Sequence, residues 1–419
     1  MSTANPGELA WPNQDSVRAQ FPGLTRIING KPLIYLDSAN TAQKFESAIL
    51  ASDRYYREYT ANVFRSVHTM GEEATVAFEG ARDSVTKLIN APERAEVIFT
   101  RGTTESINLL AHSFGSKFIK SGDVILLTEL EHHANIVPWQ MLCERVGASI
   151  RVVPISDDGV LDLAAAERSL TDEVKLFGFT HVSNALGTIN PAQALCAMAR
   201  ARGIATLIDG SQAAPHMHVD VQAIGCDFYV FTGHKVFAPT GTGVLWGKRD
   251  WLDAMPPFLG GGEMIERVSF QGTTYSGLPN KFEAGTPNIA GVIGLGAAIE
   301  SLLALGINAV AQREKQLANY AHQKLTAVDG LTLFGPPLVD SGARAPVFSF
   351  TVKNAHAHDL AMLLDQEGIA IRSGQHCAHP LLQRLGVSAT ARASLAFYNT
   401  EAEIDALIAG ILKAQRILA

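Results

Sequence analysis

The sequence predicts an α/β fold in which a large unit with a mainly parallel central sheet precedes a smaller C-terminal α+β unit. Two observations predict this fold class. In the middle of the chain, short β-branched runs that are apolar on both faces alternate with helical patterns, which is typical of strands covered by helices on both sides. From about Gly306 onward, the pattern changes to long helices around a few strands.

Seven runs are expected to form the central sheet. They are EVIFT (96–100), DVILLT (123–128), IRVVPI (150–155), KLFGFTHV (175–182), TLID (206–209), DFYVFT (227–232) and GVLWG (243–247). Three further runs are expected as strands of the C-terminal unit, namely VFSFTV (347–352), IAIRS (369–373) and ASLAFY (393–398). The last helix is expected to begin at a capping box formed by Thr400 and Glu403.

The length of 419 residues exceeds the usual size of a single core, so we expect more than one domain. We assign residues 1–30 to an N-terminal arm and a segment packing with the small domain, residues 31–305 to a large ligand-binding domain, and residues 306–419 to a small domain carrying a nucleophile loop. The glycine-rich stretch 259–279 is expected to be an exposed excursion. The apolar stretch 291–307 contains a glutamate and several glycines, so we expect a packed helix rather than a membrane span.

Composition and charge narrow the function classes. The formal net charge of −7 and the lack of any Lys/Arg-rich run argue against a nucleic-acid surface. The four cysteines show neither CxxC nor disulfide-framework spacing, which suits a reducing compartment. The first residues lack the basic and apolar regions of a signal peptide. We therefore expect a cytoplasmic protein that binds neither nucleic acid nor membrane.

Three polar stretches follow strands whose ends meet at one edge of the predicted sheet, where open α/β sheets bind ligands. In RGTTESINLL, a turn at Gly102 precedes Thr103 and Thr104, which suit a helix cap; free N–H groups there could hold a phosphate. Asp209 ends a buried run and is either a structural acceptor or the partner of a buried cation. Lys235 follows the next strand, and a buried lysine tends to lose its proton, as an imine-forming amine must. A phosphate cradle, a carboxylate and a lysine together match the needs of pyridoxal phosphate.

Cys377, in RSGQHCAHP (372–380), has three possible roles: metal ligand, core filler or nucleophile. A zinc site needs three or four ligands, and HCAH offers at most three, crowded together without a second cluster. The patterns around the other cysteines suit buried small hydrophobes: Cys143, Cys196 and Cys226. Glycine and polar residues flank Cys377, and the nearby Arg372 and imidazoles favour the thiolate, which is the form that attacks. The sequence therefore favours a nucleophile.

Nine motifs spread over nearly the whole chain carry a family resemblance. They are YLDSANTAQK, RGTTESINL, EHHANIVPWQ, HVSNALGT, DGSQ, DFYVFTGHK, FEAGTPN, RSGQHCAHPLL and RASLAFYNT. With them the sequence resembles the fold type I, class V aminotransferase-like pyridoxal phosphate enzymes, and within these the cysteine desulfurases of the SufS type (group II). The short loop GQHCAHP differs from the longer, serine-rich loop of the IscS type. The resemblance implies conversion of L-cysteine to L-alanine and a persulfide on Cys377, with the sulfur supplied for iron–sulfur cluster assembly.

The resemblance also implies roles for individual residues. Lys235 would form the Schiff base and, with His132, carry protons, while Asp209 would pair with the pyridine nitrogen and His132 would stack on the ring. Paired histidines could otherwise be a loop packed by hydrogen bonds. Further cofactor contacts are implied for Thr103, for Thr104, Thr232 and His234 mainly at the phosphate, for Gln212 and Asn184 at the ring oxygen, and for Thr286 at the phosphate of the neighbouring subunit. Substrate contacts are implied for Arg392 at the carboxylate, for Arg372 near the thiol, and for Asn184 and Asn40.

The resemblance also bears on partner proteins and on alternative functions. The resemblance implies an obligate homodimer with shared active sites and a sulfur-acceptor protein of the SufE or SufU kind. Asn40 and Phe45 stand where such enzymes usually have alanine and proline, and Phe64 stands where they commonly have histidine. These departures bear on substrate preference more than on cofactor binding. GQHCA also resembles the cysteine sulfinate desulfinase branch, so a selenocysteine lyase or cysteine sulfinate desulfinase is an alternative. A pyridoxal phosphate transaminase or lyase in which Cys377 is incidental, and a non-enzymatic scaffold for sulfur transfer, are the remaining alternatives.

Overall fold

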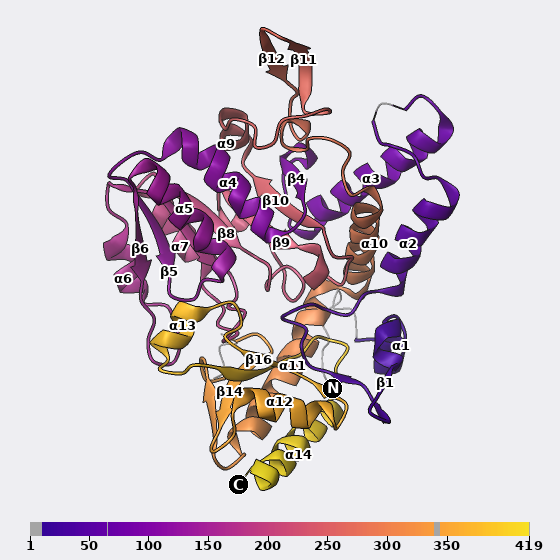
Figure 1. The fold of residues 1–419 in the computed structure, drawn as a ribbon, viewed down its shortest axis with the longest axis vertical. Helices are drawn as coiled ribbons and strands as arrows, with labels where there is room; N and C mark the ends of the chain where they lie inside the picture. The colour runs from indigo at the N-terminus through magenta and orange to yellow at the C-terminus, as the bar shows by residue number, and fades with distance from the viewer. Residues whose placement is uncertain (1–10, 65, 339–343, 419) are drawn as a thin grey trace, which may run out of the picture.

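A seven-stranded sheet forms the centre of the larger part of this computed structural model, which describes residues 11–64, 66–338 and 344–418 (Figure 1). All seven predicted runs contribute to it, in the order β4-β10-β9-β8-β7-β5-β6. β10 is antiparallel to both β4 and β9, and the other neighbours are parallel, so the prediction of a mainly parallel sheet is confirmed. The strands are β4 (Val97–Thr100), β5 (Val124–Thr128), β6 (Ser149–Val153), β7 (Val174–Thr180), β8 (Ala205–Asp209), β9 (Phe228–Thr232) and β10 (Gly243–Gly247).

Both faces of this sheet are buried. Along β9, Phe228 and Val230 belong to one apolar cluster, and Tyr229 and Phe231 belong to the cluster on the opposite face. This alternation explains why the strands are apolar throughout: each successive side chain meets a layer of helices. One face is covered by α4 (Thr103–Phe118), α5 (Val137–Val146) and α9 (Arg249–Ala254), the other by α3 (Thr69–Leu88), α6 (Leu163–Ser169), α7 (Ala192–Arg200) and α10 (Ile289–Leu305).

The apolar stretch predicted as a packed helix is α10, which lies against α2 (Glu46–Glu58) and α3. Its glycines permit the close approach, because a Cβ at Gly296 would lie 2.7 Å from the Cα of Ala81. Within the described residues, no single helix is both long enough and apolar enough to cross a bilayer. Helices α10 and α11 (Ile307–Thr326) reach that length and apolar character only when taken together, and they are bent by 75° where they meet.

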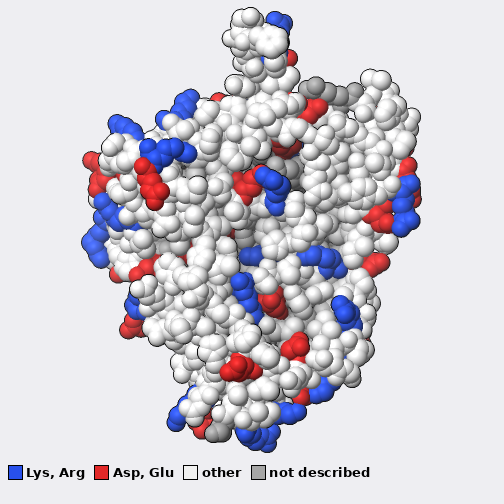
Figure 2. All heavy atoms as spheres, in the orientation of Figure 1, with Lys and Arg blue, Asp and Glu red and all other residues white. Residues whose placement is uncertain are grey.

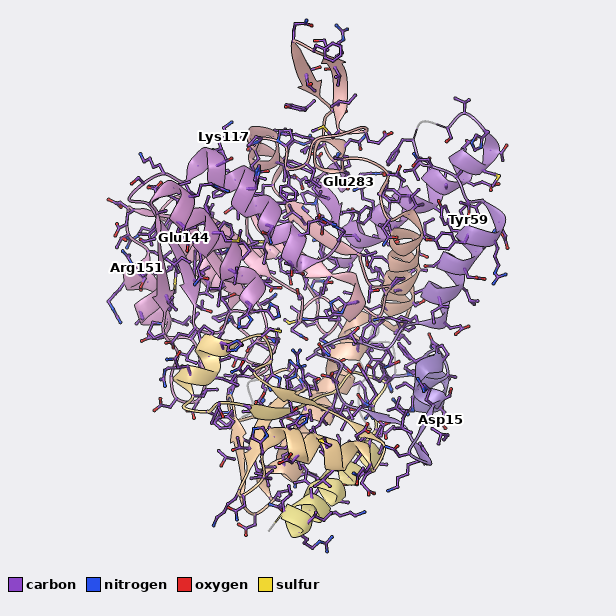
Figure 3. All side chains as sticks on the ribbon, in the orientation of Figure 1. Asp15, Tyr59, Lys117, Glu144, Arg151 and Glu283 are labelled. Carbon is purple, nitrogen blue, oxygen red and sulfur yellow. The ribbon has the colours of Figure 1, made fainter. Side chains whose placement is uncertain are left out.

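A buried ion pair ties the edge strand β4 to α3. Arg82 is fully buried and donates from Nη1 and Nη2 to the Glu283 carboxylate at 2.7 and 2.9 Å. Glu283, labelled in Figure 3, also accepts a hydrogen bond from the backbone of Phe99 in β4 at 2.7 Å. Arg82 also donates to Glu79 Oε1 at 3.1 Å, so removal of Arg82 would leave the buried Glu283 carboxylate without its cation, whereas removal of Glu283 would leave Arg82 paired with Glu79.

A four-stranded antiparallel sheet organises the C-terminal part in the order β13-β14-β17-β16. Its strands and the helices around them are β13 (Leu331–Phe334), β14 (Val347–Val352), β16 (Arg372–Gly374), β17 (Thr390–Ser394), α11, α12 (Ala357–Asp365), α13 (His379–Arg384) and α14 (Glu401–Leu418). The predicted capping box is confirmed, since Glu403 N donates to Thr400 Oγ1 at 3.3 Å and Thr400 N donates to Glu403 Oε2 at 3.0 Å.

Two strand predictions in this part need correction. The run 369–373 is divided between β15 (Ile369–Ala370), which pairs with β3 (Ile34–Tyr35), and β16. The run 393–398 was predicted as a strand, but β17 ends at Ser394 and residues 395–398 leave the sheet. These residues are apolar because they fill the junction between the two parts: the Phe397 ring lies 4.9 Å from the ring of Phe237 and 5.8 Å from that of Phe21.

The glycine-rich stretch projects from the top of the molecule in Figure 1, and the N-terminal segment with α1 and β1 lies on the lower right, beside the C-terminal part. Residues 1–10 of the predicted arm are outside the described residues, and the rest begins with α1 (Gln14–Arg18), the short strands β1 (Ile27–Ile28) and β2 (Lys31–Pro32), and β3. Arg18 donates to the carbonyl oxygen of Tyr398 at 2.7 Å. The stretch 259–279 is mostly exposed, as predicted, but contains a hairpin of β11 (Ile265–Ser269) and β12 (Gly272–Tyr275), whose pairing register shifts between Ile265 and Arg267.

Candidate active site

A cavity of about 640 Å³ lies at the edge of the large sheet where β4, β8 and β9 end. Because β10 is antiparallel to both β4 and β9, these three strands run in the same direction, and their carboxyl ends meet as predicted. On the face drawn in Figure 2, basic and acidic side chains are interspersed across the middle. Twelve of the predicted site residues line the cavity: Asn40, Thr103, Thr104, His132, Asn184, Asp209, Gln212, Thr232, His234, Lys235, Arg372 and Cys377.

Lys235 lies in the cavity directly after β9, at the end of the 3-10 turn Gly233–Lys235. Burial lowers the pKa of its amine from 10.5 to about 8, although Asp209 and Cys377 act in the opposite direction. Nζ forms no hydrogen bond with any part of the chain that the structure describes. A lysine held in this way has a substantial neutral fraction, so its nitrogen can act as a nucleophile.

Asp209 is held by the residues that follow it in the DGSQ motif. Its Oδ1 accepts hydrogen bonds from the backbone N–H and the hydroxyl of Ser211 at 2.9 and 2.6 Å. The Ser211 hydroxyl also bonds that of Thr103 at 2.7 Å, so three side chains form one chain of hydrogen bonds. Oδ2 accepts none from the described residues, which leaves one carboxylate oxygen for a group in the cavity.

The first turn of α4 forms another wall of the cavity. The sequence predicted that Thr103 or Thr104 caps this helix, but both are already helical, the N-cap is Gly102, and no side chain caps it. The Thr103 hydroxyl instead forms a hydrogen bond with the Ser211 hydroxyl, so no side chain occupies the first N–H groups of the helix and they can bind an anion. Glycine is required opposite this turn, because a Cβ at Gly243 would lie 2.4 Å from the Cα of Gly102.

His132 follows β5, and its ring is oriented by its own loop, since Nδ1 accepts from the backbone N–H of Ala134 at 3.0 Å. Burial, followed by the charge of Lys235, lowers the pKa of His132 to about 4, so the ring is neutral at physiological pH. The preceding Glu131 is buried and accepts hydrogen bonds from Asn135 Nδ2 at 2.7 Å and Thr180 N at 3.0 Å. Burial raises the pKa of Glu131 to about 8.

Cys377 lies in the loop after β16, and its backbone is left-handed. His376 and Cys377 have φ values of 53° and 56°, which is uncommon for residues other than glycine. Neighbouring groups hold this conformation: Asn184 Nδ2 donates to the carbonyl oxygen of His376 at 2.7 Å, and His133 N donates to that of Cys377 at 2.9 Å. Sγ of Cys377 accepts from Arg372 Nη2 at 3.4 Å.

Arg392 and Thr286 are the two predicted site residues that do not line the cavity. The guanidinium of Arg392 is fully buried, donating to the carbonyl oxygen of Asn184 at 2.8 Å and to Asp37 Oδ1 at 3.1 Å. Burial is the main cause of its pKa falling to about 10. Thr286 is exposed and accepts from Asn62 at 3.4 Å.

The departures from the family pattern divide into two kinds. Asn40 lines the cavity, accepts from Arg372 Nη1 at 2.9 Å and donates to Asp37 Oδ2 at 3.0 Å. Phe45 is fully buried, with its ring 4.4 Å from that of Phe21, and Phe64 packs edge-on against another ring. Neither phenylalanine lines the cavity, so both are packing residues of this chain.

The structure adds Asp37, Glu131 and Ser211, which the sequence analysis did not single out. Ser211 could have been found from its position two residues after Asp209, where a serine commonly bonds a preceding carboxylate. The role of Asp37 depends on an arginine 355 residues away, which no local pattern indicates.

The other three cysteines differ from Cys377 as predicted. Cys143, Cys196 and Cys226 are buried, while Cys377 is partly accessible. Burial raises the pKa of Cys196 to about 12 and the pKa of Cys226 well above its ordinary value. Only Cys377 therefore combines access to the cavity with a neighbouring cation.

Comparisons with known proteins identify the family of this chain. Residues 34–407 match the family model of aminotransferase class-V. A probable cysteine desulfurase of Xylella fastidiosa (strain 9a5c) is 54% identical over 97% of each chain, and a cysteine desulfurase of Salmonella agona is 49% identical over 96% of this chain and 98% of its own. The crystal structure of the cysteine desulfurase CsdA (S-sulfonic acid) from Escherichia coli has a TM-score of 0.90 and 39% identity, and covers 97% of this chain.

Proposed function

Since this chain belongs to the aminotransferase class-V family and is a pyridoxal phosphate-dependent cysteine desulfurase, we propose that Cys377 takes the sulfur of L-cysteine while Lys235 holds the cofactor. The observation that carries the proposal is that one cavity contains an amine of lowered pKa, a carboxylate with a free oxygen and a thiol bonded to a guanidinium. These are the groups that cofactor attachment and sulfur transfer require.

The residues around the cavity fit pyridoxal phosphate. The uncapped first turn of α4 suits a phosphate, the free oxygen of Asp209 suits a pyridinium nitrogen, and Gln212 has a buried Oε1 without a partner among the described residues. We propose that Lys235 forms the Schiff base, with His132 against the ring. We assign the remaining contacts to Thr103, Thr104, Thr232 and His234 at the phosphate, Gln212 and Asn184 at the ring oxygen, and Thr286 at the phosphate of the neighbouring subunit.

When bound, pyridoxal phosphate withdraws electrons and makes the α-proton of the amino acid acidic. Lys235, once its amine is free, takes that proton, which its pKa of about 8 allows at physiological pH. His132 is uncharged at this pH, so it can pass a proton without carrying a competing charge. Burial is the main cause of the lowered pKa of both residues.

Cys377 then acts as a nucleophile toward the sulfur of the substrate. A sulfur–sulfur bond forms as the carbon–sulfur bond breaks, so L-cysteine and the Cys377 thiol give L-alanine and a Cys377 persulfide without an external oxidant. The guanidinium of Arg372 donates to Sγ at 3.4 Å and so places a positive charge beside the reacting sulfur.

Substrate contacts are proposed for Arg372, Asn40, Asn184 and Arg392. The first three reach the cavity surface, where Arg372 is assigned to the region of the thiol because its Nη1 and Nη2 already bond Asn40 and Cys377. The substrate carboxylate is assigned to Arg392. Arg392 lies behind Asn184 with its Nε unpaired among the described groups, so it adds positive charge beneath the same site.

The finer assignments follow the family. We propose a homodimer of the SufS type with shared active sites, acting in the cytoplasm and passing sulfur to an acceptor of the SufE or SufU kind for iron–sulfur cluster assembly. The four unpaired cysteines support a reducing compartment. The division into residues 1–30, 31–305 and 306–419 is likewise proposed, with the cofactor in the large domain and the nucleophile in the small one.

The test uses the purified holoenzyme with L-cysteine, L-selenocysteine and cysteine sulfinate in parallel, measuring alanine release with and without a thiol acceptor. Wild type is expected to prefer L-cysteine and to carry a persulfide on Cys377 by peptide mass spectrometry. Cys377→Ser should keep the imine absorbance near 420 nm but lose turnover. Alanine release that survives in Cys377→Ser would favour a lyase in which the thiol is incidental, and equal rates on all three substrates would contradict the preference for cysteine.

A further inference from the structure

We propose that Asn40 is a positioning residue for the nucleophile, whose side-chain amide holds the guanidinium of Arg372 against the Cys377 thiolate. The inference rests on the proposed role of Cys377. It concerns a position that the resemblance leads one to expect as alanine, and it assigns to Asn40 a task in nucleophile activation in addition to its place beside the substrate.

The geometry is a chain of hydrogen bonds that ends at the sulfur. Asp37 Oδ2 accepts from Asn40 Nδ2 at 3.0 Å, and Asn40 Oδ1 accepts from Arg372 Nη1 at 2.9 Å. The other arm of the same guanidinium, Nη2, donates to Sγ of Cys377 at 3.4 Å. Because a guanidinium is rigid and planar, fixing Nη1 also fixes the direction of Nη2.

The chemistry of the partners fixes the orientation of the amide. Arg372 can only donate and the Asp37 carboxylate only accepts, so the oxygen of Asn40 must face the arginine and its NH2 must face the aspartate. Alanine at this position would leave both of these groups without their partner. Both bonds are to charged groups, which strengthens them, but Asn40 is exposed, so water offsets part of their loss.

The backbone of Asn40 is itself fixed. Its N–H donates to the carbonyl oxygen of Asp37 at 3.1 Å, which closes a tight turn. The neighbouring Ala39 is held from both parts of the molecule: its N–H donates to Ser394 Oγ at 2.9 Å, and its carbonyl accepts from Gln212 Nε2 at 2.6 Å. Through these bonds, Asn40 is fixed to residues of both parts of the molecule, and it can therefore hold the Arg372 side chain in a defined position.

Arg372 needs such a partner. It lies opposite Arg392 in the antiparallel pair β16–β17, and Arg392 already donates a hydrogen bond to Asp37 Oδ1. Within the described chain Arg372 has no ion pair with a carboxylate, and its polar partners are Asn40 and Cys377. Without the amide, repulsion from Arg392 and hydration would both favour rotation of the guanidinium away from the thiol. The other charges that act on this sulfur, Lys235 and Arg392, would remain.

The experiment measures alkylation of Cys377 by iodoacetamide in the holoenzyme, read by peptide mass spectrometry, for wild type, Asn40→Ala, Asn40→Gln, Arg372→Ala and the Asn40→Ala/Arg372→Ala pair. Asn319→Ala, at an exposed position of α11, is the matched control. At pH 7, Asn40→Ala is expected to react about three- to tenfold more slowly than wild type, as for the loss of one charge-assisted hydrogen bond.

Asn40→Gln keeps the amide and is expected to regain part of the rate at pH 7. In the Arg372→Ala background, Asn40→Ala should cause no further loss, because Asn40 acts through Arg372. Wild-type alkylation rates in Asn40→Ala at pH 7, or an equal loss with and without Arg372, would overturn the proposal. The alkylation rate does not depend on turnover. Retained alanine release in Cys377→Ser would overturn the proposed role of Cys377, but the alkylation rates would still show whether Asn40 acts through Arg372.

Discussion

Replacement of Lys235 by methionine tests the physical property on which the site depends. The pKa of Lys235 falls from 10.5 to about 8 because the amine is buried. At pH 7 this makes about 9% of the amine neutral, against about 0.03% for an ordinary lysine, a gain of more than a hundredfold in reactive nitrogen. The same lowering of the pKa means that the charged lysine destabilises the cofactor-free fold by about 3 kcal/mol, because each pKa unit corresponds to about 1.4 kcal/mol.

The sign of the effect on stability follows from the direction in which the pKa of Lys235 is changed. Since the pKa of Lys235 in the folded state lies below that of the unfolded chain, the charged lysine destabilises the fold at every pH below about 8, and the cost disappears as the pH rises from about 8 to 10.5. Methionine fills similar space without a charge. It also leaves the buried carboxylate of Asp209 without its cation, which reduces the gain, so we expect Lys235→Met to stabilise the cofactor-free protein by about 1 to 3 kcal/mol at pH 7.

The assay is urea unfolding of the cofactor-free wild type and Lys235→Met at pH 7 and at pH 10.5, followed by circular dichroism. Lys120→Met, at an exposed lysine, is the matched control and should change stability little at either pH. The advantage of Lys235→Met should shrink at pH 10.5. Equal stability of the variant and wild type at pH 7, or an advantage that does not change with pH, would refute the assignment of Lys235 as a lysine whose charge the fold disfavours.

Three further outcomes are expected. In the holoenzyme, iodoacetamide should label Cys377 first, and the other cysteines only on unfolding, which peptide mass spectrometry over time would show; early labelling elsewhere would contradict their burial. Thr103→Val should weaken cofactor binding about three- to tenfold by removing the bond to Ser211, as measured by absorbance titration, whereas Thr103→Ser should retain it. Glu403→Ala should lower the free energy of unfolding by about 1 to 2 kcal/mol, because it removes the capping-box bond to Thr400 together with the bonds of the same carboxylate to Arg18 and Asn399; an unchanged urea midpoint would show that these bonds contribute nothing.

Features that depend on burial could be predicted from the sequence. The seven strands of the large sheet were found because burial on both faces requires apolar residues at every position, and this requirement is local. The same logic found Asp209 and Lys235, since a charged residue at the end of an apolar run is conspicuous. It gave the wrong element for residues 395–398, because apolar character indicates burial and does not distinguish a strand from a loop that fills a junction between two parts.

Hydrogen-bonded partners could not be predicted in the same way. The Thr103 hydroxyl has two possible uses, as a cap or as a partner of another side chain, and its choice of Ser211 depends on how β8 and α4 are placed together in space. The partner of Arg372 is Asn40, 332 residues earlier, and the periodicity of the intervening chain gives no indication of it. Sequence patterns therefore identified which residues carry the chemistry, but not how they are oriented.

The loop of the nucleophile shows why this difference matters for function. The left-handed conformations of His376 and Cys377 are each unfavourable by about 1 to 3 kcal/mol for residues other than glycine. Asn184 and His133, which follow strands of the large sheet, donate to the carbonyl oxygens of these two residues and offset that cost. The small sheet thus supplies the sulfur, but residues of the large sheet set its position relative to Lys235. Loss of the Asn184 amide should therefore shift the thiol relative to the amine even though neither reacting group has been changed.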